Sequence, residues 1–383
     1  MITNDILYLG VNDRDIDLFE GQYVVPEGIS YNSYLIMDEK TAVMDTVDQR
    51  KKEEYLSNLE KALKGRCPDY LIISHVEPDH ASSVAAFLDK YPSTQLVGNA
   101  KTFQILSQYF ELNPDNNVTV KEGDVLSLGR HQLHFTMAPM VHWPEVMFTY
   151  DSYDKVLFSA DAFGKFGALD ADEDWLCEAR RYYFNIVGKF GMPVQTVLKK
   201  ASALDIQIIC PLHGPVLKEN LGYYLEKYQI WSSYQPEDEG VFIAYASLHG
   251  NTAAAAEKLA ALLQEKGCSR VETADLARED MAEALENAFR YSKVVLAASS
   301  YNGGVMPFME DFLHHLKGKN YQNRTVALIE NGSWAPSAKK AMCEILSQMP
   351  KINVLEPSVT IRGRMKEETM AELQALADKL LQS

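Results

Sequence analysis

The periodicity of this 383-residue chain changes at one polar stretch, and this change restricts the possible folds more than any other feature. Before residues 232–240, "SSYQPEDEG", short β-branched and aromatic runs alternate with turns, whereas after it strand and helix patterns alternate regularly. A chain of this length usually forms more than one hydrophobic core. We therefore expect two unlike domains in series, residues 1–238 and 239–383, joined by this linker with its proline and glycine.

The first part is rich in short apolar runs typical of strands, and only a few helical patterns interrupt them. The strand patterns are "SYLIM", "TAVMDTV", "YLIISH", "TQLVGN", "QLHFTMAPM", "VMFTYDS", "KVLFSAD" and "IQIICPLH". The helical patterns are "RKKEEYLSNLEKALKG", "ASSVAAFLDKY" and "NLGYYLEKYQIWSSY". Many strands with helices outside them indicate an α/β fold of the αβ/βα sandwich type, built from mixed sheets.

The second part has the pattern of a doubly wound parallel sheet. Its apolar strand patterns are "GVFIAYAS", "KVVLAASS" and "RTVALIEN", and they are followed by the helical patterns "NTAAAAEKLAALLQEKG", "FMEDFLHHLKG" and "SAKKAMCEILSQM". Strands that are apolar throughout are buried on both faces, which requires crossover helices on each side of the sheet. One domain of this kind fits the available length.

Composition excludes several classes of function. The net charge of -16 argues against nucleic acid binding, because nothing offsets repulsion from the phosphate backbone. No apolar stretch approaches the roughly 20 residues that span a bilayer, and the start, "MITNDILYLGVNDRD", lacks the pattern of a signal peptide. The five cysteines are scattered and form no CxxC pair, so we expect a cytoplasmic protein without a rubredoxin-type or zinc-ribbon centre.

Histidines and acids follow the apolar runs of the first part. The stretch "SHVEPDH", residues 74–80, follows one such run directly, and three isolated groups follow others in the same way. Strand ends meet at one edge of a sheet, where sites are commonly built. Four imidazoles and three carboxylates are enough for two divalent metals with one carboxylate bridging. The candidate ligands are His75, Glu77, Asp79, His80, His142, Asp161 and His213.

Simpler interpretations exist for each of these residues alone. A single histidine in a core is usually a hydrogen-bonded structural residue, and Asp79 could be the N-cap of the helix pattern after it. The ordered set favours the metal site. His131 and His134 alternate in a hairpin pattern, and His314 and His315 lie on an amphipathic helix pattern, so we interpret these four as structural.

Three loops at strand ends of the second part could bind a flavin. In "SLHGNT", hydroxyls, an amide and backbone N–H groups can surround a phosphate at a helix N-terminus. The absence of a GK[ST] sequence argues against a nucleoside triphosphate. The loops "SSYNGG" and "ENGSW" each add an aromatic ring that could flank an isoalloxazine. The candidates are Ser247, Leu248, His249, Gly250, Asn251, Thr252, Ser299, Ser300, Tyr301, Asn302, Gly303, Gly304, Asn331, Gly332, Ser333 and Trp334. The alternative is that all three are ordinary turns with exposed aromatics.

The first part resembles the metallo-β-lactamase-like superfamily, whose motif is HxHxDH followed by distant His, Asp and His. The sequence departs from that motif at Glu77, where the superfamily usually has a histidine. A carboxylate adds a negative charge and a harder ligand, which shifts preference from zinc toward iron. The second part resembles flavodoxins, whose phosphate loop has the form [ST]x[TY]GNT. His249 occupies the third position of that loop, and the resemblance implies FMN.

Together the two parts resemble the flavodiiron proteins, which carry the HxExDH form. The resemblance implies that His75, Glu77 and His142 hold one non-haem iron ion and that Asp79 and His213 hold the other, with Asp161 bridging. Whether His80 joins the second set stays open, because ligation by this histidine varies within the family. The implied reaction is reduction of nitric oxide to nitrous oxide, of dioxygen to water, or of both.

The resemblance also implies partners and a pocket. A small separate protein such as rubredoxin would donate electrons, and the chain would form a head-to-tail homodimer or a dimer of dimers. Tyr183, Tyr31 and Trp143 are candidates for lining the catalytic pocket, with core packing as the alternative for each. Two other functions remain open, namely a dinuclear zinc hydrolase with a flavodoxin-like module and a non-catalytic electron carrier.

Overall fold

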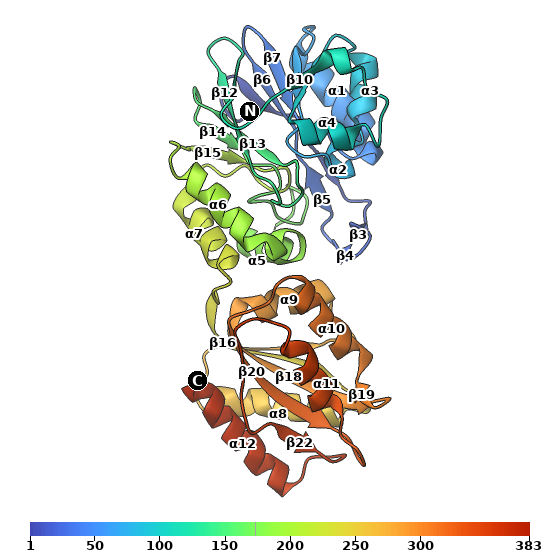
Figure 1. Ribbon diagram of the computed structural model, residues 1–383, viewed down its shortest axis with the longest axis vertical. Coiled ribbons are helices and arrows are strands. Elements are labelled where there is room, and N and C mark those ends of the chain that lie inside the picture. The colour runs from blue at the N-terminus through green and yellow to red at the C-terminus, as the bar shows by residue number, and fades with distance from the viewer. Residues whose placement is uncertain (173) are drawn as a thin grey trace. The chain divides into compact units, whose positions relative to one another are not determined.

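The computed structural model describes residues 1–172 and 174–383, and it divides the chain into two compact units, residues 1–229 and 230–383 (Figure 1). The first unit contains two larger mixed sheets. One sheet has the order β1 (Ile6–Tyr8), β6 (Tyr34–Met37), β7 (Thr41–Met44), β8 (Tyr70–Ile72), β9 (Gln95–Gly98) and β10 (Asn117–Thr119). The other has the order β11 (Val125–Ser127), β12 (Gln132–Met137), β13 (Met147–Asp151), β14 (Val156–Phe158) and β15 (Ile208–Cys210). Two small sheets pair β2 (Val11–Asp13) with β5 (Ile29–Tyr31) and β3 (Leu18–Phe19) with β4 (Tyr23–Val24).

Helices accompany both sheets of the first unit. Figure 1 shows α1, α3 and α4 on the side of the six-stranded sheet, and α5, α6 and α7 grouped together elsewhere in the unit. The α-helices are α1 (Lys52–Leu63), α2 (Pro78–Ala81), α3 (Val84–Lys90), α4 (Ala100–Leu106), α5 (Trp175–Tyr182), α6 (Gly191–Ala201) and α7 (Leu221–Ser232). Shorter turns are the 3-10 segments η1 (Gln49–Lys51), η2 (Pro114–Asn116) and η4 (Gly188–Phe190), and the π-helical segment η3 (Tyr183–Val187).

The core of the first unit lies between its two larger sheets. Ile36 and Met44 of one sheet belong to the same buried cluster as Phe135, Met147 and Phe158 of the other. All five residues of β13 are buried, so this strand is covered on both faces rather than alternating between core and solvent. The structure therefore confirms the predicted sandwich, in which sheets form the inside and helices the outside.

Strand directions bring several loops of the first unit to common edges. β7, β8 and β9 are parallel, so the loops that follow them leave the first sheet on the same edge. In the second sheet, β12 is antiparallel to β13 and β13 to β14, whereas β14 is parallel to β15. β12, β14 and β15 therefore point the same way, and the loops after all three also share an edge.

The second unit contains one mainly parallel sheet. Its order is β17 (Val271–Asp275), β16 (Asp238–Ala246), β18 (Tyr291–Tyr301), β20 (Arg324–Asn331) and β21 (Ile352–Val354). In addition, β22 (Val359–Ile361) pairs in parallel with the last residues of β20, and β19 (Gly304–Val305) forms a hairpin with β18. In chain order this arrangement is 2-1-3-4-5, the flavodoxin-like form of the doubly wound fold. The predicted parallel sheet is therefore confirmed.

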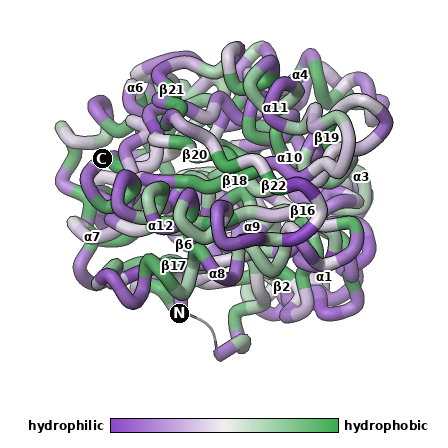
Figure 2. Tube along the Cα trace, turned by 90° about the horizontal axis from the view of Figure 1, so that it is seen from below, coloured by the Kyte–Doolittle hydropathy of each residue, from purple (hydrophilic) through white to green (hydrophobic). Residues whose placement is uncertain are grey.

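Helices cover both faces of this sheet. In Figure 1, α8 (Asn251–Glu265) and α12 (Glu367–Gln382) lie on one face, and α9 (Met281–Arg290), α10 (Pro307–Gly318) and α11 (Ala338–Leu346) lie on the other. β18 and β20 appear green, that is hydrophobic, in Figure 2. Seven consecutive residues of β20 pair with β18, and the strand is buried over most of its length, which explains its nearly continuous apolar sequence.

Candidate metal centre and flavin cradle

The seven predicted metal ligands lie in four segments that leave the sheets at strand ends. His75 and Glu77 follow β8, and the next turn, α2, carries Asp79 and His80. The loops after β12, β14 and β15 carry the remaining three, His142, Asp161 and His213. Pro78 occupies the first position of α2, where its missing N–H costs nothing. The N-cap of this short helix is Glu77, so Asp79 lies inside the helix and does not cap it.

One cluster consists of four side chains: His75, Glu77, His142 and Asp161. Glu77 Oε2 lies 3.1 Å from the Nε2 atoms of both His75 and His142. Asp161 Oδ2 lies 3.0 Å from His142 Nε2 and 3.4 Å from His75 Nε2. Two ligand atoms at about 2.1 Å from one metal ion and roughly at right angles lie about 3 Å apart. These separations fit four atoms of one coordination shell.

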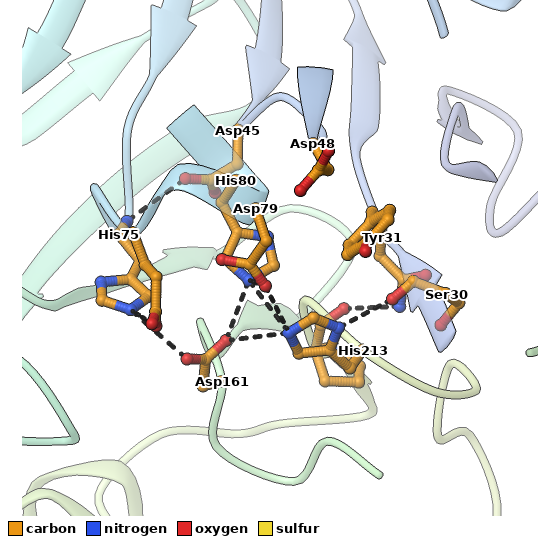
Figure 3. A network of polar contacts seen from close by, with 12 residues as sticks. Ser30, Tyr31, Asp45, Asp48, His75, Asp79, His80, Asp161 and His213 are labelled. Carbon is orange, nitrogen blue, oxygen red and sulfur yellow. Dashed lines mark hydrogen bonds and ion pairs between the residues drawn. The ribbon is translucent and has the colours of Figure 1, made fainter. Parts of the chain in front are cut away.

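A second cluster consists of Asp79, His80 and His213. The Nε2 atoms of the two histidines lie 3.1 Å apart, and Asp79 Oδ2 lies 3.2 Å from each of them. Asp161 joins this cluster through its other oxygen, because Oδ1 lies 3.3 Å from His80 Nε2 and 3.7 Å from His213 Nε2. Asp161 thus presents one carboxylate oxygen to each cluster, as a bridging ligand does. Figure 3 shows His75, His80 and His213 converging on it.

Four atoms of this site lack a hydrogen-bond partner among the described residues, although buried polar groups normally have one. Both carboxylate oxygens of Asp79, Oδ1 of Asp161 and Nδ1 of His80 are buried without a hydrogen bond among the described residues. Such orphaned atoms are costly unless a ligand satisfies them. Four imidazoles and three carboxylates around one space are the ligand types that suit divalent iron or zinc. The residues therefore fit a pair of metal ions.

Neighbouring histidines favour the ionised form of two acids of this site, Asp161 and Glu77. Burial favours the neutral form of Asp161, but His75, His142 and His80 outweigh it and set its pKa well below the usual range. Burial likewise opposes the charge of His142, yet its hydrogen bonds with Asp161 and Glu77 raise its pKa to about 9. The pKa of Glu77 is lowered by His142 and His75 in spite of burial. A bound cation would compete with the proton for His142.

Groups behind the ligands orient two of the imidazole rings. Glu145 Oε1 accepts a hydrogen bond from His75 Nδ1 at 2.7 Å, and the carbonyl oxygen of Ser30 accepts one from His213 Nδ1 at 2.7 Å. Each bond fixes the proton on Nδ1, so that the Nε2 lone pair faces the cluster. Asp45 follows β7 and accepts a hydrogen bond from the backbone N–H of Ser74 at 2.7 Å, which fixes the start of the ligand segment.

The three predicted pocket residues differ in their surroundings. The ring of Trp143 lies 5.3 Å from that of His75, and the ring of Tyr31 lies 6.1 Å from that of His213. Tyr183 packs against Tyr228, with ring centroids 5.1 Å apart.

Tyr182, which the sequence interpretation missed, is the tyrosine of α5 beside the cluster. Its ring lies 5.5 Å from that of His213, and its hydroxyl is buried without a hydrogen bond among the described residues. Burial and the charges of Asp161, Asp79 and Glu77 raise its pKa well above the usual range. The helix changes to the π form directly after Tyr182, and such changes are frequent at functional sites. The repeated tyrosine in "RRYYFNIV" hides which of the two faces the site.

The second unit contains a cavity of about 320 Å³ at the ends of β16, β18 and β20. Each of the three predicted loops contributes to its lining. Of the predicted residues, those that line it are Ser247, Leu248, His249, Asn251, Thr252, Ser299, Ser300, Tyr301, Asn302, Gly303, Asn331, Gly332, Ser333 and Trp334. Gly250 and Gly304 shape the loops without lining the cavity, whereas Ala335, Ser337 and Gly363 line it and were not predicted.

Backbone geometry explains the glycines of this cradle. Gly250 is the N-cap of α8 and has φ +84°, a conformation that strains other residues. A Cβ atom at Gly332 would lie 2.8 Å from Pro336 Cα and 3.0 Å from Ser300 Oγ. Asn302 and Gly303 both have positive φ and form the two-residue turn between β18 and β19, as Asn-Gly pairs do in type I′ hairpins.

Hydrogen bonds lock the loops to one another around the cavity. Thr252 Oγ1 and Ser299 Oγ are 2.9 Å apart, and Asn331 Nδ2 donates to the carbonyl of Gly363 at 2.8 Å. At the rim, Tyr301 and Trp334 are exposed by 43% and 89%, so both rings are free to stack on a planar ligand. A helix N-terminus with hydroxyl groups beside exposed aromatics fits a phosphorylated flavin.

The fold defines a class of protein in which a lactamase-like unit precedes a flavodoxin-like unit. Residues 29–214 match the family model described as ODP family beta lactamase, and residues 242–366 match one described as a flavodoxin domain. An anaerobic nitric oxide reductase flavorubredoxin from Vibrio vulnificus is 31% identical over 345 residues, covering 87% of this chain and 70% of that relative. The chain belongs to the flavodiiron protein family.

Solved structures show the same architecture over nearly the whole chain. Rubredoxin oxygen:oxidoreductase from Desulfovibrio gigas, at 24% identity, aligns with a TM-score of 0.92 over 100% of this chain and 97% of that one, which supports the fold. A flavo di-iron protein variant from Thermotoga maritima, at 25% identity, aligns with a TM-score of 0.89 over 98% of this chain and 95% of that one. Among the described residues, no helix combines the length and apolar character needed to cross a bilayer.

Proposed function

We propose that this protein is a flavodiiron reductase that converts nitric oxide to nitrous oxide, dioxygen to water, or both, with electrons passed through FMN from an external donor. The observation that carries this proposal is the pair of clusters that share Asp161, with Glu77 in the place of a customary histidine. The carboxylate favours iron over zinc at the first position. The flavin cradle in the same chain supplies the second redox centre that a multi-electron reduction needs.

The geometry supports a particular assignment of ligands. His75, Glu77 and His142 would hold one iron, and Asp161 would be shared with the other. Asp79, His80 and His213 would hold the second iron, and His80 is included because its Nε2 lies as close to Asp79 as that of His213 does.

Bound iron supplies a place for the gas and two of the electrons, while reduced FMN supplies two more, which together suffice for dioxygen. The protein contributes the surroundings of that place. Trp143 and Tyr182 pack beside the ligand rings and shield the cluster from water, and Tyr31 does so from the side of His213. The hydroxyl of Tyr182 is a hydrogen-bond donor not engaged by any described residue, so it is available to a bound gas.

The proposal also covers the domain boundaries, the electron donor, the location and the assembly. Residues 1–238 form the diiron domain and residues 239–383 the FMN domain, with the cavity-lining loops binding FMN. The donor is a small rubredoxin-like protein. The protein acts in the cytoplasm as a head-to-tail homodimer or dimer of dimers, in which the flavin of one copy serves the irons of another. The five cysteines are free thiols, as is typical of a reducing compartment such as the cytoplasm. Light scattering would measure the oligomeric state.

Metal analysis followed by a gas pulse tests the reductase proposal. We expect two irons and one FMN per chain, and rapid oxidation of the reduced flavin when nitric oxide or dioxygen is added to protein that was reduced anaerobically. Turnover with each gas, driven by one artificial donor, ranks the two substrates. Two zinc ions with hydrolysis of an ester or thioester would instead identify a hydrolase, and an iron-loaded protein whose flavin is not reoxidised at a catalytic rate would identify an electron carrier.

A further inference from the structure

The two metal clusters differ in what lies behind their histidines. His75 Nδ1 donates its hydrogen bond to a carboxylate, Glu145 Oε1, at 2.7 Å, whereas His213 Nδ1 donates to a neutral carbonyl, that of Ser30, at the same distance. His80 Nδ1 is buried with no hydrogen bond among the described residues. An anionic acceptor makes the imidazole a stronger electron donor at Nε2 than a neutral one does. The first cluster therefore receives more negative charge through its ligand rings.

Glu145 is held tightly in this position. Its side chain is buried, and the same oxygen that accepts from His75 also accepts from the backbone N–H of Val76 at 3.0 Å. Its backbone carbonyl accepts a hydrogen bond from Asn99 Nδ2 at 2.6 Å. Glu145 shares its loop with His142, so one short segment provides a ligand of the first cluster and the carboxylate behind another ligand of it.

Glu145 also unbalances the charge of two otherwise equal sites. Each cluster has one carboxylate of its own, Glu77 or Asp79, and each shares Asp161. A buried carboxylate nearby, Asp45, is engaged at Oδ1 by the backbone N–H groups of Ser74 and His75 rather than by an imidazole ring. Buried negative charge that reaches a metal through its ligand favours the higher oxidation state.

We infer that Glu145 is a positioning residue that makes the iron at His75, Glu77 and His142 the first of the pair to be oxidised. This inference rests on the proposed diiron function and adds the order in which the two irons are oxidised. The hydrogen bond to His75 lowers the reduction potential of that iron relative to its neighbour. When the diferrous protein loses one electron to an oxidant such as ferricyanide, which becomes ferrocyanide, the ferric ion forms in the first cluster.

Two substitutions at one position separate the charge of Glu145 from its structural role. Glu145→Gln keeps an oxygen that can accept from His75 Nδ1 but removes the charge. Glu145→Ala removes both, and loss of such a partner typically weakens metal affinity roughly 10- to 100-fold. Glu60→Gln is the matched control, because it removes the same charge from a surface ion pair with Lys90, outside the site.

The measurement is a redox titration of the FMN-loaded protein containing iron-57, followed by Mössbauer spectroscopy, which reports only the iron. We expect the first one-electron step of Glu145→Gln to move to a more positive potential and the gap between the two iron steps to narrow, with iron content retained. Glu60→Gln should leave the gap unchanged. Circular dichroism and FMN content confirm that each variant is folded.

Two results would overturn the inference. One is a gap between the iron steps that is the same in Glu145→Gln and the unaltered protein, which would leave Glu145 a purely structural role. The other is a shift confined to the second step, which would place the effect on the other iron. Failure of the proposed function would look different, because the unaltered protein would then bind no iron or show no gas-driven oxidation.

Discussion

The two candidate sites of this chain consist of different kinds of chemical group. The metal clusters consist of buried ionisable side chains, such as His75, Asp161 and His213, which come from strand ends far apart in the sequence. The flavin cradle consists mainly of loop backbone shaped by glycines such as Gly250 and Gly332, with polar side chains and exposed rings around it. A charged cluster costs free energy until its ligand arrives, whereas a cradle of backbone groups is formed in advance. Metal binding at the first site should therefore depend on charge, and flavin binding at the second site should depend on the shape of the loops.

The largest effect is expected when the carboxylate shared by both clusters is removed. Asp161→Asn takes one negative charge away from both clusters, so we expect loss of both irons and a fall in gas turnover of roughly 100-fold or more. FMN content should not change, because the cradle lies in the other unit. Iron analysis, flavin absorbance and turnover are the measurements. Asp205→Asn, the same change at a surface ion pair, is the control and should leave all three unaltered.

A change of shape should have the converse effect on the second site. In Gly332→Ala the new Cβ meets the backbone of Pro336, and overpacking of this kind costs about 1–3 kcal/mol. We therefore expect FMN affinity to fall roughly 5- to 150-fold while iron content is retained. Fluorescence titration of flavin-free protein gives the affinity. Gly318→Ala, where a Cβ has open space, should bind FMN normally, and an equal loss there would refute the steric explanation.

A change of ligand type at Glu77 sharpens the comparison within the metal site. Glu77→His should keep the fold but weaken iron relative to zinc, and turnover should fall roughly tenfold. Metal competition followed by elemental analysis measures the preference. Glu77→Gln removes the charge without adding a ring, and so separates the loss of the carboxylate charge from the gain of an imidazole ligand. Iron content and turnover that are the same in Glu77→His and the unaltered protein would show that the carboxylate does not select the metal.

A further prediction concerns the stability of the metal-free protein and its dependence on pH. The pKa of His142 is raised to about 9 in the folded state, from an unfolded value of about 6.5. Its protonation therefore stabilises the fold fully below the unfolded pKa, and this contribution, of the order of 3 kcal/mol, is lost as pH rises through the folded pKa. Urea unfolding of chelated protein at about pH 6 and about pH 9.5 should show this loss, and His142→Gln should show less of it. Iron binding should strengthen over the same range, because the metal competes with the proton.

Much of the fold follows from sequence periodicity alone. The apolar runs that become β6, β8 and β20 are short, rich in β-branched residues and bounded by turn residues, so local pattern and tertiary structure agree. Periodicity predicted no helix between β14 and β15, where the structure has α5 and α6. The segment "RRYYFNIV" is aromatic and β-branched, yet it lies in α5 and the π-helical turn after it, because burial on all sides removes the amphipathic signal.

The order of the candidate metal ligands in the sequence predicted which side chains would meet, because chemistry restricts ligands to a few residue types. Groups that support ligands carry no such signal. Glu145 has the appearance of any acid in a loop, and only the 2.7 Å contact with His75 distinguishes it. Asp45 and Tyr182 were missed for the same reason, since their neighbours in space are distant in the chain.

The sequence by itself determined the two-domain order, the types of side chain that are candidate metal ligands and the glycine-rich loops, because each depends on local pattern or on the chemistry of single residues. Tertiary structure decided which oxygen of Asp161 faces which cluster and which of two adjacent tyrosines faces the site. It also decided that one imidazole is paired with a carboxylate and another with a carbonyl. These features depend on strand directions and helix phase, which place groups from separate segments within hydrogen-bonding distance.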